Sequence, residues 1–328
     1  LADAERDSDR IYAVIKGLGS SSDGKGQAVY APSPEGQARA LRAAYRNAGV
    51  TPDTVGLVEA HGTGTIVGDT TEISGLTSVY GDSGREGSWC ALGSVKSMIG
   101  HTKAAAGAAG LIKAVMALHH KTLPPTIKVK EPNEAVTPGE TPFYINTEKR
   151  PWLPESGHPR RAGVSAFGFG GSNFHCVVEE YKGQASHVDW DGRDQIFAFS
   201  AESHETLAST LARFDAGSEW AEIRRRAGET RVTFDTSHEA RLLMVVERDG
   251  KSPADLIALA LGRLEETKSA WNLPQGVYFG SGSSKGGWAA CFPGQGAQYV
   301  GMLRELICRF PVAADTLARA SGATPGLI

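Results

Sequence analysis

The chain contains few cysteines and no long apolar run, and each shortage excludes a class of protein. Its four cysteines, among 328 residues, follow neither a disulfide framework nor a metal-binding spacing. The longest apolar stretch, residues 104–118, is interrupted by Lys113 and is too short to span a bilayer. We therefore expect a protein of a reducing cytoplasm, with no metal site and no membrane segment.

An excess of basic charge is also lacking. The 34 Lys and Arg residues face 37 Asp and Glu residues, and the net charge is −3. This balance leaves no basic footprint for nucleic acid. No signal peptide is visible, although Leu1 is not a natural start and an upstream signal would be missing. Hydrophobic and charged contents of 41% and 22% are typical of a soluble globular protein, and the length suits about two domains.

Two histidines occupy glycine-rich turns, and each turn follows a strand-like run. His61 lies in Glu-Ala-His-Gly-Thr-Gly-Thr at 59–65, and His101 lies in Lys-Ser-Met-Ile-Gly-His-Thr at 96–102. Histidines at the ends of two strands can converge, and paired neutral imidazoles can stabilise an oxyanion or assist loss of a carboxylate. A lone histidine is more often a satisfied core residue. The pair predicts a catalytic site.

Strand-like and helix-like patterns alternate up to about residue 181. Strands are predicted at 11–15, 55–59, 89–95, 163–166 and 174–179, and helices after Ser33-Pro34, after an Asp69-x-x-Glu72 capping box and over 102–119. This alternation predicts a layered α/β fold. Beyond residue 183, strands at 195–201, 242–246 and 277–280 with helices at 203–214 and 253–264 predict a second, small α/β module.

The histidine turns resemble those of the β-ketoacyl synthases, the condensing enzymes of polyketide and fatty-acid synthases. Val-Ser-Ala-Phe-Gly-Phe-Gly-Gly-Ser-Asn-Phe-His at 164–175 and Leu-Pro-Pro-Thr at 123–126 support the resemblance in order and spacing. Pro-Phe-Tyr-Ile-Asn-Thr at 142–147 is most similar to ketosynthases of iterative polyketide synthases, including enediyne and polyunsaturated fatty-acid types.

The resemblance implies a domain order. Residues 1–181 would be the C-terminal half of a thiolase-like fold, and 182–286 a small α/β linker domain between ketosynthase and acyltransferase. Residues 287–328 would be the truncated start of an acyltransferase domain. There Gly-Gln-Gly at 294–296 would place Gln295 in the oxyanion hole of the transferase.

The resemblance also implies roles for single residues. His61 and His101 would donate hydrogen bonds to the developing oxyanion of a malonyl thioester, and Lys96 would order the site electrostatically. The alternative for Lys96 is a surface lysine at a strand end. His101 would lie at a helix N-terminus, which disfavours the imidazolium form.

Four other positions would contact the acyl chain or its carrier arm. Thr63 and Thr65, at alternate positions, would hydrogen-bond phosphopantetheine, although ordinary capping by threonine is the alternative. Phe169 would gate the acyl pocket and lend its amide to the oxyanion hole, and Gly170 would adjoin the substrate. No cofactor is expected to bind directly, because phosphopantetheine is carried by the acyl carrier protein partner.

The family's nucleophile is absent. Its motif, similar to Asp-x-Ala-Cys-Ser-Ser, lies upstream of the first histidine turn, and no cysteine of this chain has those neighbours. We therefore expect an N-terminal ketosynthase half on another chain or removed, and a homodimer formed through the ketosynthase. The alternative is a non-elongating ketosynthase or a chain-length-factor-like scaffold. Cys at the upstream nucleophile position would favour condensation, and Gln or Gly would favour the alternative.

We predict that residues 195–285 pack against the ketosynthase and do not swing freely. The module is small, and Trp152 and Trp190 flank the junction as apolar contacts. Limited proteolysis should therefore leave residues 182–194 uncut under conditions that cut exposed loops. Ready cleavage that releases a freely tumbling module would contradict this expectation.

Overall fold

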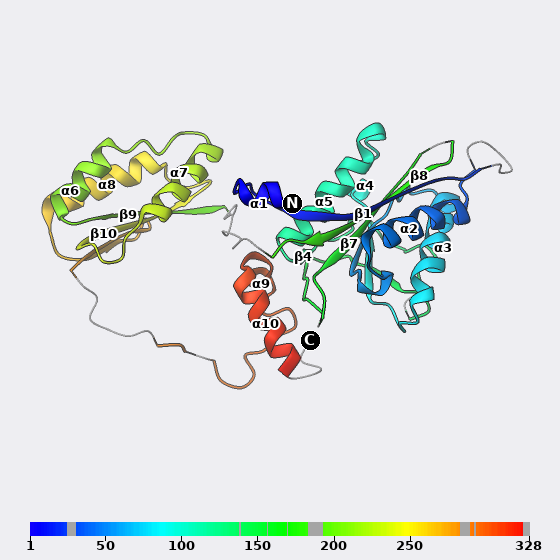
Figure 1. The fold of residues 1–328 in the computed structure, drawn as a ribbon. Coiled ribbons are helices and arrows are strands. Elements are labelled where there is room, and N and C mark those ends of the chain that lie inside the picture. Colours follow the sequence, from blue (N-terminus) through cyan, green and yellow to red (C-terminus); the bar gives the residue numbers. More distant parts are fainter. Residues whose placement is uncertain are drawn as a thin grey trace. The chain divides into compact units, whose positions relative to one another are not determined.

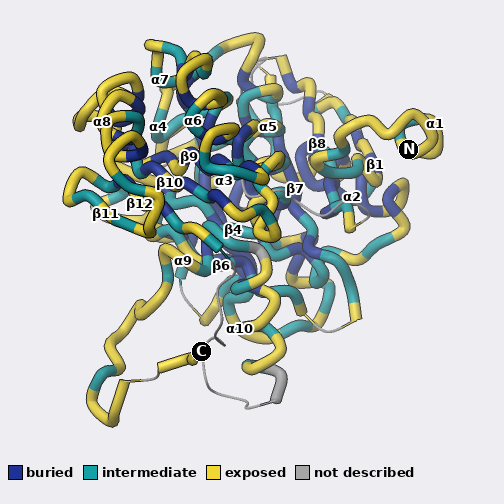
Figure 2. The backbone as a smooth tube through the Cα atoms, turned by 90° about the vertical axis from the view of Figure 1, so that its left-hand side faces the viewer, coloured by how far each residue is buried: buried dark blue, intermediate teal, exposed yellow. Residues whose placement is uncertain are grey.

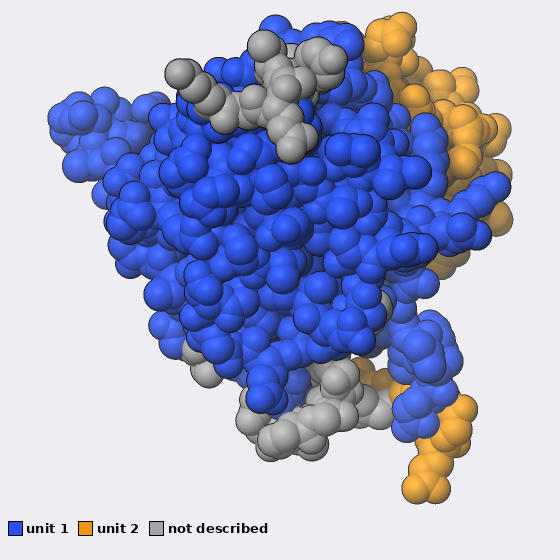
Figure 3. Space-filling view, turned by 90° about the vertical axis from the view of Figure 1, so that its right-hand side faces the viewer, with its two compact units in different colours: residues 1–188, 298–328 blue, residues 189–297 orange. Residues whose placement is uncertain are grey.

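The structure is a computed structural model, and it describes residues 1–24, 31–137, 139–155, 157–168, 170–182, 193–282, 289–291 and 293–323. The chain divides into two compact units (Figure 3). One comprises Leu1–Val188 with Gln298–Ile328, and the other comprises Asp189–Ala297. Each unit has its own principal sheet (Figure 1).

A six-stranded sheet organises the first unit. Its strands lie in the order β1 (Ala13–Ser22), β8 (Ser172–Glu180), β7 (Arg161–Gly168), β2 (Leu57–Glu59), β3 (Cys90–Gly93) and β5 (Phe143–Ile145). β8 is antiparallel to its neighbours β1 and β7, whereas β7, β2, β3 and β5 are parallel. The parallel centre with helical crossovers confirms the predicted layered α/β fold.

Helices cover both faces of this sheet. The helices α2 (Pro34–Ala48) and α3 (Ile66–Tyr80) share a buried cluster with Val58 and Val177. The helix α5 (Ala106–His119) shares another cluster with the adjacent residues Leu57 and Val178. Because successive side chains of a strand point to opposite faces, the two clusters lie on opposite sides of the sheet. The central strands are accordingly mostly buried (Figure 2).

Two glycines of β1 allow α2 to lie directly on the sheet. A Cβ atom at Gly19 would lie 2.0 Å from the Ala40 carbonyl oxygen, and one at Gly17 would lie 2.4 Å from the Ala44 carbonyl oxygen. Both obstacles are backbone atoms, which cannot rotate away. The sheet and the helix therefore pack at a distance that only glycine permits at these two positions.

The helix signals had mixed outcomes. Ser33 caps α2 as predicted, and its Oγ accepts a hydrogen bond from the Gly36 amide at 3.1 Å. The capping box at Asp69 and Glu72 is wrong, because α3 already begins at Ile66. The cap is Thr65, whose hydroxyl accepts from the Gly68 amide at 3.2 Å. The two carboxylates are therefore free to bind the turn that precedes the helix.

Short elements complete the first unit. They are α1 (Ala2–Arg6), α4 (Lys96–Ile99), the antiparallel pair β4 (Thr122–Leu123) and β6 (Arg150–Pro151), α9 (Arg304–Arg309), α10 (Pro311–Ala323), and the 3-10 turns Pro52–Thr54, Gly81–Ser83 and Lys103–Ala105. The Thr122 hydroxyl donates to the Cys308 carbonyl oxygen at 3.2 Å, and Lys121 Nζ lies 3.1 Å from the Asp315 carboxylate. The helices α9 and α10 thus lie with the first unit, and the assignment of 287–328 to an acyltransferase stays a prediction.

The second unit has an antiparallel sheet in the order β11 (Trp271–Leu273), β12 (Val277–Ser281), β10 (Ala240–Glu247) and β9 (Asp194–Ala201). Its helices are α6 (His204–Arg213), α7 (Trp220–Thr233) and α8 (Pro253–Glu266). Phe197, Leu242 and Leu256 are among the residues that form its core. The sequence did not predict α7, because a run of three arginines obscures its apolar stripe.

The predicted bracing of the small module rests on two tryptophans. Trp152 is buried in the α5-side cluster of the first unit. Trp190 lies outside the described residues. The bracing therefore stays a prediction.

We expect Gly19→Ala to destabilise the protein by about 3 kcal/mol, because the added methyl group overlaps the α2 backbone. Urea unfolding measures this loss. Gly81→Ala is the control, since a Cβ there has no neighbour within 4 Å and the backbone φ is −63°. Equal stability of the two variants would contradict the close packing of β1 and α2.

Candidate active site

The two histidines of the glycine-rich turns meet in the structure. Their ring centroids are 5.5 Å apart, and the ring planes are nearly perpendicular at 84°. His61 follows β2, and His101 follows α4, the short helix after β3. Because β2 and β3 are parallel neighbours, their carboxyl ends lie at one edge of the sheet. The strand-end placement predicted from the sequence therefore produces the convergence.

A buried carboxylate holds the first histidine turn. Glu72 of α3 accepts the amides of His61 and Gly62 on its two oxygens, at 2.7 and 2.8 Å. Burial raises the pKa of Glu72 to about 7, and the two amide donors work against this rise. The sequence treated Glu72 as a helix cap, so its contact with the His61 turn was missed.

The pKa of each imidazole is lowered, which favours the neutral form. Burial, followed by the charges of Lys96 and then His101, lowers the pKa of His61 to about 4. The pKa of His101 is lowered by desolvation, by Lys96 and by Lys103. The Lys103 amide donates to His101 Nδ1 at 3.0 Å, so the neutral ring carries its proton on Nε2. The donor amide belongs to the 3-10 turn Lys103–Ala105, and α5 itself begins only at Ala106.

Lys96 lies beside the histidine pair. Its ammonium donates to the His61 carbonyl oxygen. Desolvation lowers the pKa of Lys96, while the surrounding carboxylates of Glu72, Glu59 and Asp69 raise it. The lysine is half-buried and linked to the His61 turn, in contrast to the surface lysine that was the alternative.

The two threonines face each other at the start of α3. Their hydroxyl oxygens are 2.9 Å apart, as expected for side chains on one side of the turn. Thr65 also caps the helix, and Asp69 accepts the Gly64 amide at 3.1 Å. Capping is thus observed for Thr65. Contact with phosphopantetheine stays a prediction for both residues.

Strand β7 approaches the site through Phe167, just before the glycine turn that leads to β8. The Phe167 ring lies 5.8 Å from that of His61, a neighbour that the sequence did not single out. Phe169 lies outside the described residues. Gly170 has φ of 90°, a conformation that favours glycine, and its Cβ position is open. The gating role of Phe169 and the substrate contact of Gly170 stay predictions.

Three cysteine thiols, those of Cys90, Cys176 and Cys308, lack the lowered pKa of an activated nucleophile. Burial raises the pKa of Cys90 in β3 and of Cys176 in β8, whereas a nucleophilic thiol needs a lowered pKa. Burial also raises the pKa of Cys308. Gln295 is exposed in the loop that precedes α9. Its part in a transferase oxyanion hole stays a prediction.

The described residues contain neither a metal-binding cluster nor a membrane-spanning helix. Among those residues, no three His, Cys, Asp or Glu side chains gather as a metal site, although the rings of His119 and His120 are 5.0 Å apart. None of the helices in the described part of the chain has the length and hydropathy to cross a membrane.

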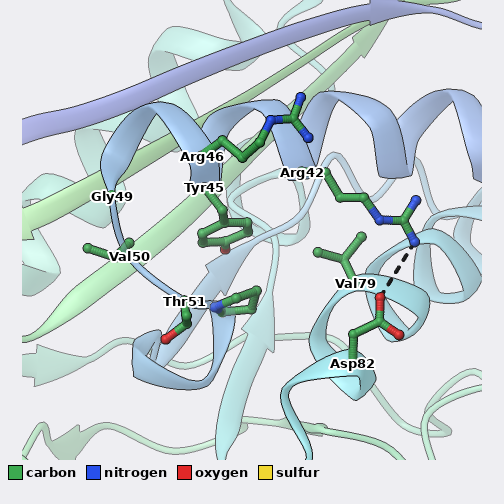
Figure 4. Close-up of a pocket in the computed structure, with 9 residues that line it drawn as sticks. Arg42, Tyr45, Arg46, Gly49, Val50, Thr51, Val79 and Asp82 are labelled. Carbon is green, nitrogen blue, oxygen red and sulfur yellow. Dashed lines mark ion pairs between the residues drawn. The ribbon is translucent and has the colours of Figure 1, made fainter.

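A hollow of about 440 Å³ opens between α2, the turn after it and α3 (Figure 4). It is lined by Arg42, Tyr45, Arg46, Gly49, Val50, Thr51, Pro52, Val79 and Asp82. Arg42 lies 3.7 Å from the Asp82 carboxylate. No predicted site residue lines this hollow, so the candidate chemistry stays with the histidine pair.

Known protein families match the chain over two adjoining regions. The model of the "Beta-ketoacyl synthase, C-terminal domain" matches residues 12–130, and that of the "Ketoacyl-synthetase C-terminal extension" matches residues 132–245. The chain belongs to the β-ketoacyl synthases. It is the C-terminal ketosynthase portion of a polyketide or fatty-acid synthase, followed by the family's C-terminal extension.

Individual relatives support the same family assignment. The chain is 44% identical over 334 residues to a polyunsaturated fatty acid synthase protein of Thraustochytrium sp., covering 94% of the chain and 12% of that protein. It is 35% identical over 324 residues to a phenolphthiocerol/phthiocerol polyketide synthase protein of Mycobacterium tuberculosis, covering 97% and 20%. The chain thus spans a fifth or less of these relatives' length.

A solved structure shares the fold. The ketosynthase from module 6 of the bacillaene synthase of Bacillus subtilis matches with a TM-score of 0.54 and 34% identity. The match covers 81% of this chain and 46% of that one. The predicted thiolase-like ketosynthase fold is therefore confirmed.

We expect the Lys96→Met variant to raise the pKa of His61 from its value of about 4, because a nearby positive charge is removed. The pH dependence of His61 acylation by diethyl pyrocarbonate, followed by mass spectrometry, reports this pKa because only the neutral ring reacts. The control is Lys16→Met, which removes a lysine on β1. A His61 midpoint that does not move in Lys96→Met would contradict the electrostatic role of Lys96.

Proposed function

We propose that this chain supplies the histidine side of a ketosynthase active site. The reaction is the decarboxylative condensation of a malonyl-type extender, carried by an acyl carrier protein, with an acyl group on an enzyme cysteine. The observation that supports this proposal is the pair of neutral imidazoles 5.5 Å apart, with Lys96 bound to the backbone of one of them. Neutral N–H donors suit an oxygen that gains negative charge during the reaction.

The histidines act on the malonyl half-reaction. Their N–H groups donate to the thioester oxygen of the malonyl unit while its carbon–carboxylate bond breaks and carbon dioxide leaves. The electron pair of that bond becomes an enolate, and the negative charge collects on the hydrogen-bonded oxygen. The enolate carbon then attacks the acyl-cysteine carbonyl, a carbon–carbon bond forms, and the cysteine thiolate departs.

The nucleophilic cysteine belongs, in this proposal, to an N-terminal ketosynthase half. An apolar surface beside α5 supports such a partner, since Ile112 and Met116 of the helix are exposed. Leu18 of β1 and Phe174 of β8 are exposed as well. Gly17 and Gly19 face α2, so Leu18 between them points to the α5 side of the sheet. The upstream half would cover this surface and bring its cysteine to the histidines.

The carrier protein presents its substrate on a phosphopantetheine arm. Thr63 and Thr65, whose hydroxyls face each other beside His61, would hydrogen-bond that arm. Phe169 and Gly170 would border the acyl pocket from the β7–β8 turn. No cofactor would bind to the chain itself, and the ketosynthase would act as a homodimer in the cytoplasm.

The iterative type of synthase is a further part of this proposal. The 44% identity to a polyunsaturated fatty acid synthase protein supports it. Residues 182–286 would be the linker domain, and 287–328 would begin an acyltransferase with Gln295 in its oxyanion hole. The second candidate function is a non-elongating or scaffolding ketosynthase, and the residue at the upstream nucleophile position would decide between the two.

Replacing His61 or His101 by Ala in the complete synthase should reduce condensation on the order of 100-fold or more, because each removes an oxyanion donor. Acyl loading of the upstream cysteine should continue, since loading depends mainly on the thiolate. Radiolabelled acyl transfer and product formation measure the two steps.

The matched control is His120→Ala, which removes an exposed histidine just after the far end of α5. Unchanged product formation in the His61 or His101 variant would contradict the proposal. A wild-type synthase that binds both substrates without forming product would support the scaffolding alternative.

A further inference from the structure

A buried ion pair lies among three segments around the histidine pair: the end of β2, the turn that begins α4, and α5. Glu59 is the last residue of β2, and its side chain is almost fully buried. Lys113 of α5 lies on the same face of the sheet as this side chain, and Lys113 Nζ is 2.9 Å from Glu59 Oε2. The Lys113 side chain is only 10% exposed. Such a pair persists in a low-dielectric interior only when each charge has its partner.

The carboxylate of this pair joins two of the segments. Glu59 stands two positions before His61, and its Oε1 accepts the Val95 amide at 2.5 Å. Val95 directly precedes Lys96 and the α4 turn that leads to His101. One carboxylate therefore connects the His61 strand end to the backbone of the Lys96 turn.

The lysine adds the third segment. The helix α5 follows His101 after a short 3-10 turn, and Lys113 extends from it back to Glu59. A Cβ atom at Gly110 would lie 3.0 Å from Glu59 Cγ, and one at Gly93 would lie 2.1 Å from Thr126 Oγ1 and 3.7 Å from Lys113 Nζ. Gly110 thus leaves space for the Glu59 side chain, and Gly93 leaves space for Thr126 beside the ion pair.

We infer that Glu59 and Lys113 are positioning residues for the histidine pair. Neither touches the reacting atoms. Glu59 holds the Lys96 turn through the Val95 amide, and Lys113 keeps Glu59 ionised and oriented for that bond. The expected effect on catalysis rests on the proposed function. The effect on the position of the Lys96 turn does not depend on any reaction.

Lys113→Met tests the inference, because it removes the charge and keeps the length of the side chain. A buried carboxylate without its counter-ion turns toward water, and the Val95 amide then loses its acceptor. In the complete synthase we expect kcat for condensation to fall on the order of 100-fold, as for a site displaced by about 1 Å. KM for the malonyl carrier protein and acyl loading should change less than about threefold.

Glu59→Gln combined with Lys113→Met provides the rescue. The glutamine carbonyl oxygen can still accept the Val95 amide, and the double variant buries no unpaired charge. We expect kcat to return to within about fivefold of wild type. A folded double variant that is no more active than Lys113→Met alone would overturn the inference, as would wild-type kcat in Lys113→Met.

Arg161→Met is the matched control, because Arg161 is 11% exposed and pairs with Glu179 at 2.7 Å at the opposite end of β7. Its melting temperature should fall as in Lys113→Met, with kcat retained. An equal loss of kcat in Arg161→Met would attribute the effect to lost stability and would overturn the positioning role.

Amide hydrogen exchange separates this inference from the proposed function. Lys113→Met should accelerate exchange at residues 95–100, and the double variant should restore protection, whether or not the synthase condenses. Unchanged exchange in Lys113→Met would overturn the inference even if condensation is confirmed. If Lys113→Met accelerates exchange but the wild-type synthase forms no product, the positioning role would be upheld and the proposed function rejected.

Discussion

The parallel pairing of β2 with β3 is the constraint on which the site depends. Val58 pairs with Leu92 and Glu59 with Gly93, so both strands end at the same level. The two histidine turns therefore start side by side although 40 positions separate His61 from His101. A shift of one residue would turn Glu59 away from Val95 and Lys113, because side chains alternate along a strand. The register of β2 and β3 therefore fixes both the packing and the charge pairing of the site.

Three carboxylates and two ammonium groups surround the histidines. Glu59, Asp69 and Glu72 are carboxylates whose pKa values are raised, first of all, by burial. Lys96 and Lys113 are the ammonium groups among them. Four of these groups form hydrogen bonds to the backbone. The three carboxylates accept amides of the turns, and Lys96 donates to a carbonyl oxygen. The set fixes the loops, while burial and then the nearby charge of Lys96 lower the pKa of His61.

Sequence reasoning predicted what depends on local pattern. The strand ends before His61 and His101, the Ser33 cap and the small module with β9, β10 and β12 follow from periodicity and turn residues. The partners of Glu59, Glu72 and Lys113 could not be predicted in this way. Glu72 has capping-box spacing, yet Thr65 caps the helix, and Lys113 looks like an interruption of an apolar run. Their contacts depend on tertiary placement, which local spacing does not encode.

The hydroxyl of Thr65 has a consequence for turnover. It accepts the Gly68 amide and lies 2.9 Å from the Thr63 hydroxyl, and a hydroxyl has only one proton to donate. The Thr63 hydroxyl in turn donates to Asp69 Oδ1 at 3.4 Å, so an arm that takes a proton from either threonine would replace an existing hydrogen bond and would not add to it. The net gain on docking is then small. Such weak binding would suit a carrier that must dissociate after every cycle.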